Sequence, residues 1–291
     1  MKNIPDFFEE ILINQYGKNL SEKIIKGYIE KKTTLRVNTL KISSQDIKKK
    51  LEKENIEYEE VPWNENALII NSDKNIRDFD FYKNGEIYMQ SLSSMLPPIV
   101  LEPKLGENIL DMAAAPGGKT TQIAAMTNNE AYITACEKNK IRLERLKYNL
   151  NKQGAKFVNV MQEDARKLSD FLKFDKILLD APCSGSGTEN IFEEKFTKEL
   201  INRSSKTQEE LLKKALKIVK SDGEIVYSTC SILNQENEKI IDKFIKERKC
   251  EIIPIEIPKE IETLPTEILG TVCVCPSKYF EGFFIAKIRK L

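Results

Sequence analysis

Apolar positions in the first third of the chain follow helical and strand periods in turn. The predicted elements are a helical segment at 7–32, a strand at 34–40, a helix at 43–56 and short strands at 58–62 and 67–71. Ser43 and Ser44 are the candidate caps of the basic helix. One helical segment followed by strand, helix, strand and strand predicts a small α+β domain that ends near Gly85.

From about residue 107 the pattern changes to short apolar runs that alternate with helical stretches. Strands are predicted at 108–112, 131–136, 157–161, 176–179 and 224–228, helices at 142–153 and 208–219, and a final edge strand at 282–288. Near-continuous apolar strands separated by helices are typical of a parallel sheet covered on both faces. We therefore expect two domains, 1–87 and 88–291, joined around residues 82–94.

The amino-acid composition excludes several classes of protein and of active site. The chain of 291 residues is 41% hydrophobic and 31% charged, and its 46 Lys and Arg nearly balance its 45 Asp and Glu. This balance fits a soluble globular protein, and any nucleic-acid surface must be a local basic patch. There is no histidine, which excludes the Ser-His-Asp triad, Cys–His pairs and zinc sites that contain histidine.

The six cysteines are spread along a long lysine-rich chain rather than crowded into a small framework. This usage predicts a reducing compartment, and no apolar run has the length of a signal peptide or a membrane span. We expect a cytoplasmic monomer with no metal site and no membrane contact. Cys273 and Cys275 alternate in a strand without histidine partners and are predicted to be structural.

The segment Ile109-Leu-Asp-Met-Ala-Ala-Ala-Pro-Gly-Gly-Lys-Thr-Thr predicts a strand, a loop of small residues and a helix. It departs from a phosphate-binding P-loop, because Ala113 replaces the first glycine and Pro116 removes a backbone donor. The dinucleotide fingerprint G-x-G-x-x-G is absent. The remaining alternatives are a loop for an adenosyl ligand, such as S-adenosylmethionine, or a tight turn without a ligand.

Two acidic residues favour the adenosyl ligand. Glu137 ends the second predicted strand of the sheet, where a carboxylate can accept hydrogen bonds from ribose hydroxyls. Asp164 ends the third, close to the expected position of an adenine. Each acid alone is more often a helix cap or a solvated side chain. Their occurrence at successive strand ends predicts a nucleoside site.

Two cysteines lie at the ends of later strands. An apolar strand leads to Asp180 and Cys183 in Asp180-Ala-Pro-Cys-Ser-Gly, and another leads to Cys230 in Tyr227-Ser-Thr-Cys-Ser. Either cysteine alone is most simply a small buried hydrophobe. Two thiols at neighbouring strand ends beside an acid predict a reactive pair instead.

A thiol beside a methyl-donor site is useful when the atom that accepts the methyl group is not itself nucleophilic. Carbon 5 of a pyrimidine becomes nucleophilic only after a thiolate has added to carbon 6. Asp180 can assist by protonating ring nitrogen 3. A second group must then help to remove the carbon-5 proton and to expel the thiol. The chemistry alone does not decide which cysteine attacks.

The chain resembles the Nol/Nop/Sun family of RNA cytosine-5 methyltransferases over most of its length. The motifs that carry the resemblance are Thr34-Leu-Arg-Val-Asn-Thr-Leu, Tyr88-Met-Gln-Ser-Leu-Ser-Ser-Met-Leu, Ala-Pro-Gly-Gly-Lys at 115–119, Asp180-Ala-Pro-Cys-Ser-Gly, Tyr227-Ser-Thr-Cys-Ser, Gln235-Glu-Asn-Glu and Gly282-Phe-Phe-Ile-Ala-Lys. The combination of Ala-Pro-Gly-Gly-Lys with both cysteine motifs is highly specific. Ser91 and Ser277 depart from the family pattern, in which an acid and a histidine are common at these positions.

The resemblance implies a Rossmann-like, S-adenosylmethionine-dependent α/β methyltransferase domain and a smaller, RNA-recognition-like α+β domain before it. The residues it implies for cofactor binding are Ala113, Ala114, Ala115, Pro116, Gly117, Gly118, Lys119, Glu137, Arg142, Asp164 and Asp180.

For catalysis, the resemblance identifies Cys230 as the nucleophile and implicates Cys183 in resolving the adduct. We also place Asp180 and Lys119 among the catalytic residues. The expected partner is RNA, with tRNA favoured and ribosomal RNA as the alternative. A P-loop nucleotide hydrolase and a non-catalytic RNA-binding protein are alternatives from other classes.

Overall fold

The computed structural model describes residues 4–291 and comprises two compact units. Unit 1 combines the described residues up to Lys31 with Arg166–Leu291, and unit 2 is Lys32–Ala165. The expected domains, 1–87 and 88–291, divide the chain elsewhere and remain a prediction; residues 1–3 lie outside the described range. Across that range no helix combines the length and the apolar character needed to cross a membrane.

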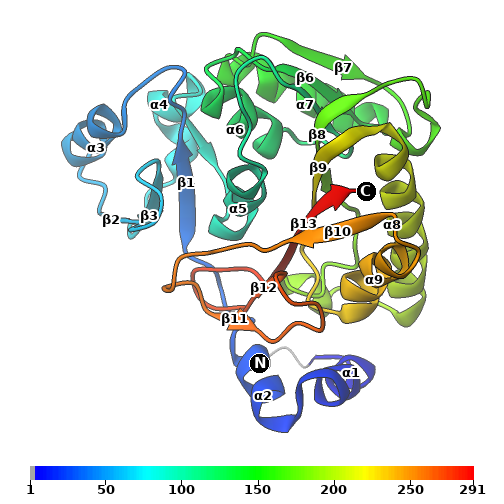
Figure 1. Ribbon diagram of the computed structural model, residues 1–291. Coiled ribbons are helices and arrows are strands. Elements are labelled where there is room, and N and C mark those ends of the chain that lie inside the picture. Colours follow the sequence, from blue (N-terminus) through cyan, green and yellow to red (C-terminus); the bar gives the residue numbers. More distant parts are fainter. Residues whose placement is uncertain (1–3) are drawn as a thin grey trace. The chain divides into compact units, whose positions relative to one another are not determined.

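Unit 2 begins with a four-stranded antiparallel sheet in the order β2-β3-β1-β4. Its elements are β1 (Thr33–Val37), α3 (Ser44–Lys53), β2 (Tyr58–Glu60), β3 (Ala67–Ile70), a 3₁₀ turn (Ile76–Asp78), α4 (Asp80–Lys83) and β4 (Ile87–Met89) (Figure 1). The predicted strand–helix–strand–strand order is confirmed. The sheet also continues past Gly85, because β4 pairs with β1.

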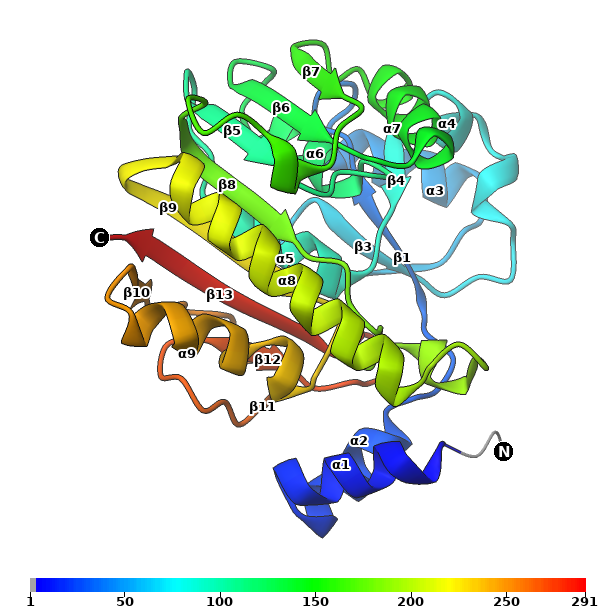
Figure 2. The ribbon, with the colours of Figure 1, turned by 90° about the vertical axis from the view of Figure 1, so that its right-hand side faces the viewer.

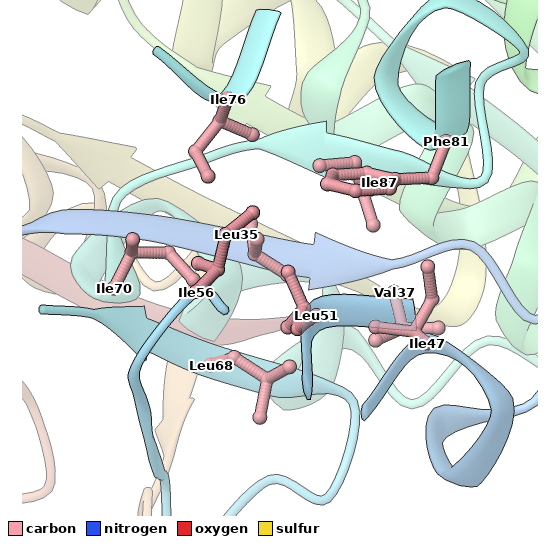
Figure 3. Packing of buried hydrophobic residues seen from close by; sticks show 10 residues of the cluster. All are labelled: Leu35, Val37, Ile47, Leu51, Ile56, Leu68, Ile70, Ile76, Phe81 and Ile87. Atoms are coloured by element: carbon pink, nitrogen blue, oxygen red, sulfur yellow. The ribbon is translucent and has the colours of Figure 1, made fainter. Parts of the chain in front are cut away.

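The core of this sheet follows directly from the sequence pattern. Leu35 and Val37 alternate along β1, while Ile47 and Leu51 stand one helical turn apart on α3, and all four are buried. Figure 3 shows these side chains meeting between the helix and the strands. The hydroxyl of Ser43 accepts a hydrogen bond from the Asp46 N–H at 3.1 Å, which confirms Ser43 as the helix cap.

The remainder of unit 2 carries the first strands of the predicted parallel sheet. These elements are α5 (Leu92–Leu101), β5 (Asn108–Asp111), α6 (Gly118–Met126), β6 (Tyr132–Cys136), α7 (Lys140–Gln153) and β7 (Val158–Met161). β6 pairs in parallel with both β5 and β7. Asn139 caps α7, and Gly154 ends it in the left-handed region with φ 75°.

Unit 1 contains two parallel strands, β8 and β9, extended by antiparallel strands. Its elements are β8 (Phe174–Asp180), a 3₁₀ turn (Glu189–Phe192), α8 (Lys198–Ile218), β9 (Val219–Thr229), η4 (Asn234–Glu236), α9 (Glu238–Lys246), β10 (Cys250–Ile253), β11 (Thr263–Leu264), β12 (Val272–Val274) and β13 (Phe283–Lys290). β8 and β9 are parallel, and α8 runs along both (Figure 2).

The expectation that the last strand lies at an edge is wrong. β13 pairs with β9 on one side and with β12 and β10 on the other. Residues 283–288 are all buried, as an interior strand requires. The partners β10 and β12, and β11 beyond β12, are too short for periodicity to have identified them.

The predicted helical segment at 7–32 is a helical hairpin, α1 (Asp6–Tyr16) and α2 (Lys18–Lys26), which breaks at Gly17 with φ 75°. The hairpin packs within unit 1. Tyr16 donates its hydroxyl to the Ile232 carbonyl, and Tyr28, just after α2, donates to the Ser186 carbonyl. The hairpin therefore supports two loops that follow β8 and β9.

We expect Tyr28→Phe to lower the free energy of unfolding by about 1–3 kcal/mol, because the buried Ser186 carbonyl loses its donor. Denaturant unfolding followed by circular dichroism measures this change. Tyr148→Phe, at an exposed tyrosine, serves as the control and should leave stability unchanged. Equal stability of the two variants would show that the hairpin contact contributes nothing.

Candidate active site

The loop between β5 and α6 is shaped by two glycines. Gly117 has φ 108°, a conformation that side chains rarely adopt, and a Cβ at Gly118 would lie 3.1 Å from the ring of Tyr88. The helix starts at Gly118, so the N–H groups of its first turn are available beside the loop. Loop and helix start together form a narrow cradle of small residues.

Asp111, the last residue of β5, fixes the start of this helix. Its buried carboxylate accepts a hydrogen bond from the Thr120 hydroxyl at 2.7 Å. Asp111 was not among the site residues predicted from the sequence. An acid that ends an apolar strand directly before a loop of small residues was the available signal.

Glu137 follows β6, and its side chain is only 4% exposed. The carboxylate accepts a hydrogen bond from the Asn139 N–H at 2.7 Å and pairs with Arg142 at 3.4 Å. Arg142 also donates to the Ala115 carbonyl at 2.6 Å. Arg142 therefore ties the loop of small residues to the carboxylate at the next strand end.

Two further contacts complete the surroundings of the loop. Asn149 on α7 donates to the Pro116 carbonyl at 2.8 Å, a role the sequence analysis missed. Lys119 extends to the Ser94 hydroxyl at 2.8 Å. Asp164 follows β7, the parallel neighbour of β6, so it and Glu137 come after adjacent strands as expected.

These residues fit an adenosyl group. Small side chains from Ala113 to Gly118 let a ligand approach the backbone, and the buried carboxylate of Glu137 suits ribose hydroxyls. The pattern lacks the phosphate-wrapping geometry of a P-loop, because Pro116 has no N–H to donate. In the described part of the chain, no cluster of three or more cysteines and acids could hold a metal ion.

The second group of predicted residues lies in unit 1, at the ends of β8 and β9. The Sγ atoms of Cys183 and Cys230 are 3.1 Å apart, and both cysteines are free thiols. Asp180 ends β8 opposite Ser228 of β9 and accepts a hydrogen bond from its hydroxyl at 2.8 Å. The parallel pairing of the two strands brings the two thiols into direct contact.

The pKa of Cys183 is raised well above that of an ordinary thiol. The hydrogen bond to Cys230 is the main cause, followed by burial and by the nearby charges of Cys230 and Glu236. Cys183 is therefore a thiol at neutral pH. Its Sγ lies within hydrogen-bond distance of the sulfur of Cys230, and either sulfur can be the donor.

The other four cysteines are buried away from this pair. Burial raises the pKa of Cys136 to about 12 and the pKa values of Cys250 and Cys275 to about 11. It raises the pKa of Cys273 as well. These thiols stay protonated at neutral pH and pack as apolar side chains.

Comparison with known families identifies the fold that carries these two groups. Residues 98–289 match the family described as 16S rRNA methyltransferase RsmB/F, and residues 4–77 match the ferredoxin-like domain of the same methyltransferases. The chain belongs to the RsmB/F family. As the resemblance to Nol/Nop/Sun proteins predicted, this RsmB/F member is an S-adenosylmethionine-dependent RNA cytosine-5 methyltransferase.

Individual relatives within the RsmB/F family differ in length. The tRNA (cytosine(49)-C(5))-methyltransferase of Pyrococcus abyssi is 35% identical over 96% of this chain and 95% of its own length. The ribosomal RNA small subunit methyltransferase F of Shewanella piezotolerans is 36% identical over 89% of this chain, which spans 57% of that relative.

A solved structure of similar size supports the fold of this RsmB/F member. The crystal structure of NSun6 from Pyrococcus horikoshii with SFG, an S-adenosylmethionine analogue, has a TM-score of 0.91 and 28% identity, and the match covers 99% of each chain. The predicted α/β methyltransferase fold with its smaller α+β domain is confirmed. The P-loop hydrolase alternative gains no support.

The raised pKa of Cys183 predicts its reactivity. Because only the thiolate reacts with iodoacetamide, alkylation of Cys183 should be slow near pH 7 and should increase only at a higher pH than alkylation of glutathione does. Peptide-resolved mass spectrometry of the native protein at a series of pH values measures both rates. A Cys183 profile that coincides with that of glutathione would contradict the assigned protonation state.

Proposed function

We propose that this protein methylates carbon 5 of cytosine in tRNA through a covalent adduct with Cys230. The observation that carries the proposal is the contact of two free thiols at 3.1 Å beside Asp180, one of them held in its protonated form. A methyltransferase whose acceptor is already nucleophilic needs no such pair. Carbon 5 of cytosine is not nucleophilic until a thiolate has added to the ring.

The proposed addition uses Cys230 and Asp180. Cys230 releases its S–H proton to solvent as its sulfur forms a bond to carbon 6, and Asp180 transfers a proton to ring nitrogen 3 as electron density moves toward carbon 5. S-adenosylmethionine, when bound, supplies the methyl group that carbon 5 accepts. Ser228 holds the Asp180 carboxyl group through its hydroxyl while this proton moves.

The proposed elimination uses Cys183. As the bond between carbon 6 and sulfur breaks, Cys183 transfers its S–H proton to the departing sulfur of Cys230. The resulting thiolate of Cys183 accepts the proton from carbon 5, and nitrogen 3 returns its proton to Asp180. One proton is released overall, which balances the transfer of a methyl cation to a neutral base.

The proposed cofactor-binding residues are Ala113–Lys119, Glu137, Arg142, Asp164 and Asp180. Its support is the loop of small residues, the buried carboxylate at the strand end and the arginine that joins them. We assign Lys119 to contact with the substrate RNA. We further propose that the protein acts as a monomer in the cytoplasm, where its thiols remain reduced.

The choice of tRNA rests on the relatives. The Pyrococcus relative that matches this chain along nearly its full length is named a tRNA methyltransferase. The Shewanella relative named for ribosomal RNA is longer, and this chain spans only 57% of it. Ribosomal RNA remains the second candidate, because those relatives share comparable identity.

The two cysteines should give opposite phenotypes. Cys230→Ala should abolish both methyl transfer and any protein–RNA adduct, because the bond-forming thiol is missing. Cys183→Ala should still add to carbon 6 but should release product about 100-fold more slowly, so an adduct that survives denaturing gels accumulates. Asp180→Asn should suppress the adduct, and an adduct lost in Cys183→Ala instead would reverse the assignment.

Bisulfite sequencing should identify the substrate. In cells that lack the gene, we expect 5-methylcytosine to disappear from at least one tRNA position and to remain in ribosomal RNA. Restoring the wild-type gene should restore the mark, and restoring the Cys230→Ala variant should not. Loss of a mark from ribosomal RNA alone would replace tRNA with the second candidate.

A further inference from the structure

Glu236, in the 3₁₀ turn η4, is a carboxylate with an exposed fraction of 0%. It lies in unit 1 between the loops that follow β8 and β9, and the mechanism above gives it no role. A buried acid is costly unless several donors satisfy it. The identity of those donors indicates what Glu236 does.

The amide of Gln208 donates to this carboxylate at 3.5 Å, and the shorter bonds come from the residues that directly follow the two thiols. Ser184, next to Cys183, donates its backbone N–H to one carboxylate oxygen at 2.7 Å and its hydroxyl to the other at 2.6 Å. Ser231, next to Cys230, donates its hydroxyl to that second oxygen at 2.6 Å. A single carboxylate therefore holds the residue after each cysteine.

Other bonds join the same loops farther from the thiols. The hydroxyls of Ser186 and Ser231 lie 2.7 Å apart, and the Gly187 N–H donates to the Cys230 carbonyl at 2.9 Å. These contacts hold the later part of the loop after β8. Glu236 holds the start of that loop at Ser184, directly after Cys183, and Gln208 donates to the Pro182 carbonyl just before it at 2.9 Å.

We propose that Glu236 is a positioning residue that keeps the two thiols in contact for the elimination step. The proposal rests on the covalent mechanism of the previous subsection. If the contact loosens, Cys230 still attacks carbon 6, because Asp180 and the end of β9 remain in place. Cys183 then meets the departing sulfur less often, so the adduct persists. Loss of Glu236 should thus resemble loss of Cys183 rather than loss of Cys230.

Glu236→Gln tests this role with little change in volume, because the amide keeps one acceptor oxygen and presents donors to groups that themselves donate. Glu238→Gln is the matched control. Glu238 is also buried, its pKa is also raised by burial, and it begins the next helix, but none of its hydrogen bonds reaches Ser184 or Ser231. Thermal unfolding first shows that both variants are folded.

With Glu236→Gln, we expect kcat to fall about ten- to a hundred-fold while KM for RNA and for S-adenosylmethionine stays unchanged. A denaturation-resistant protein–RNA adduct should accumulate, as in Cys183→Ala. Glu238→Gln should show neither effect. Equal kinetics for the two variants, or a fall in kcat without adduct, would overturn the positioning role.

A second variant keeps the test decisive if Glu236→Gln fails to fold. Ser184→Ala removes a hydroxyl donor and leaves the carboxylate in place, so a milder accumulation of adduct is expected. The Cys183→Ala variant separates the two levels of the proposal. If it traps adduct and the Glu236 and Ser184 variants do not, Glu236 has no positioning role; if it traps none, the covalent mechanism fails and this role fails with it.

Discussion

The contact between two thiols is the constraint on which the rest of unit 1 depends. Cys183 and Cys230 come from separate strands, and their sulfurs meet at 3.1 Å only because β8 and β9 run parallel in fixed register. Parallel strands end at the same edge of a sheet, so each contributes a loop to the same place. Strand pairing brings the two cysteines close to each other, and the hydrogen bonds of the loops then hold their sulfurs in contact.

These loops are held from two directions. From within, Glu236 and the paired serine hydroxyls join one loop to the other. From outside, Tyr16 and Tyr28 of the hairpin segment satisfy backbone carbonyls of the same loops. The hairpin segment is thus part of the support of the thiol pair, although the family comparison places it in the ferredoxin-like domain. The boundaries of the two family domains therefore differ from the boundaries of the two compact units.

The sequence predicted the structure correctly where the local apolar pattern and the chemistry of the residues agree. Apolar alternation, helix caps and the order of elements predicted the small sheet of unit 2, and the strand-end rule predicted that Asp180, Cys183 and Cys230 would lie together. The position of β13 was not predictable, because an apolar strand reads the same at an edge and in the interior when its partners are short. The apolar pattern did not predict the break at Gly17, because the apolar spacing continues across this residue.

The roles of Asp111 and Glu236 depended on contacts that no local pattern encodes. Ser184 and Glu236 lie 52 positions apart in the chain, and only the folded pairing of β8 with β9 brings them together. A glutamate in a charged stretch such as Gln235-Glu-Asn-Glu resembles a surface residue by composition. Its complete burial is a property of the tertiary structure.

The discontinuity of unit 1 has a consequence for biosynthesis. Its hairpin precedes unit 2 in the sequence, whereas the loops that bear the two thiols follow unit 2. The hairpin tyrosines must remain without their carbonyl partners while all of unit 2 is synthesised. Unit 2 has a continuous sequence and can form its contacts during translation. The contacts between the hairpin and the loops that bear the thiols therefore form only after all of unit 2 has been synthesised.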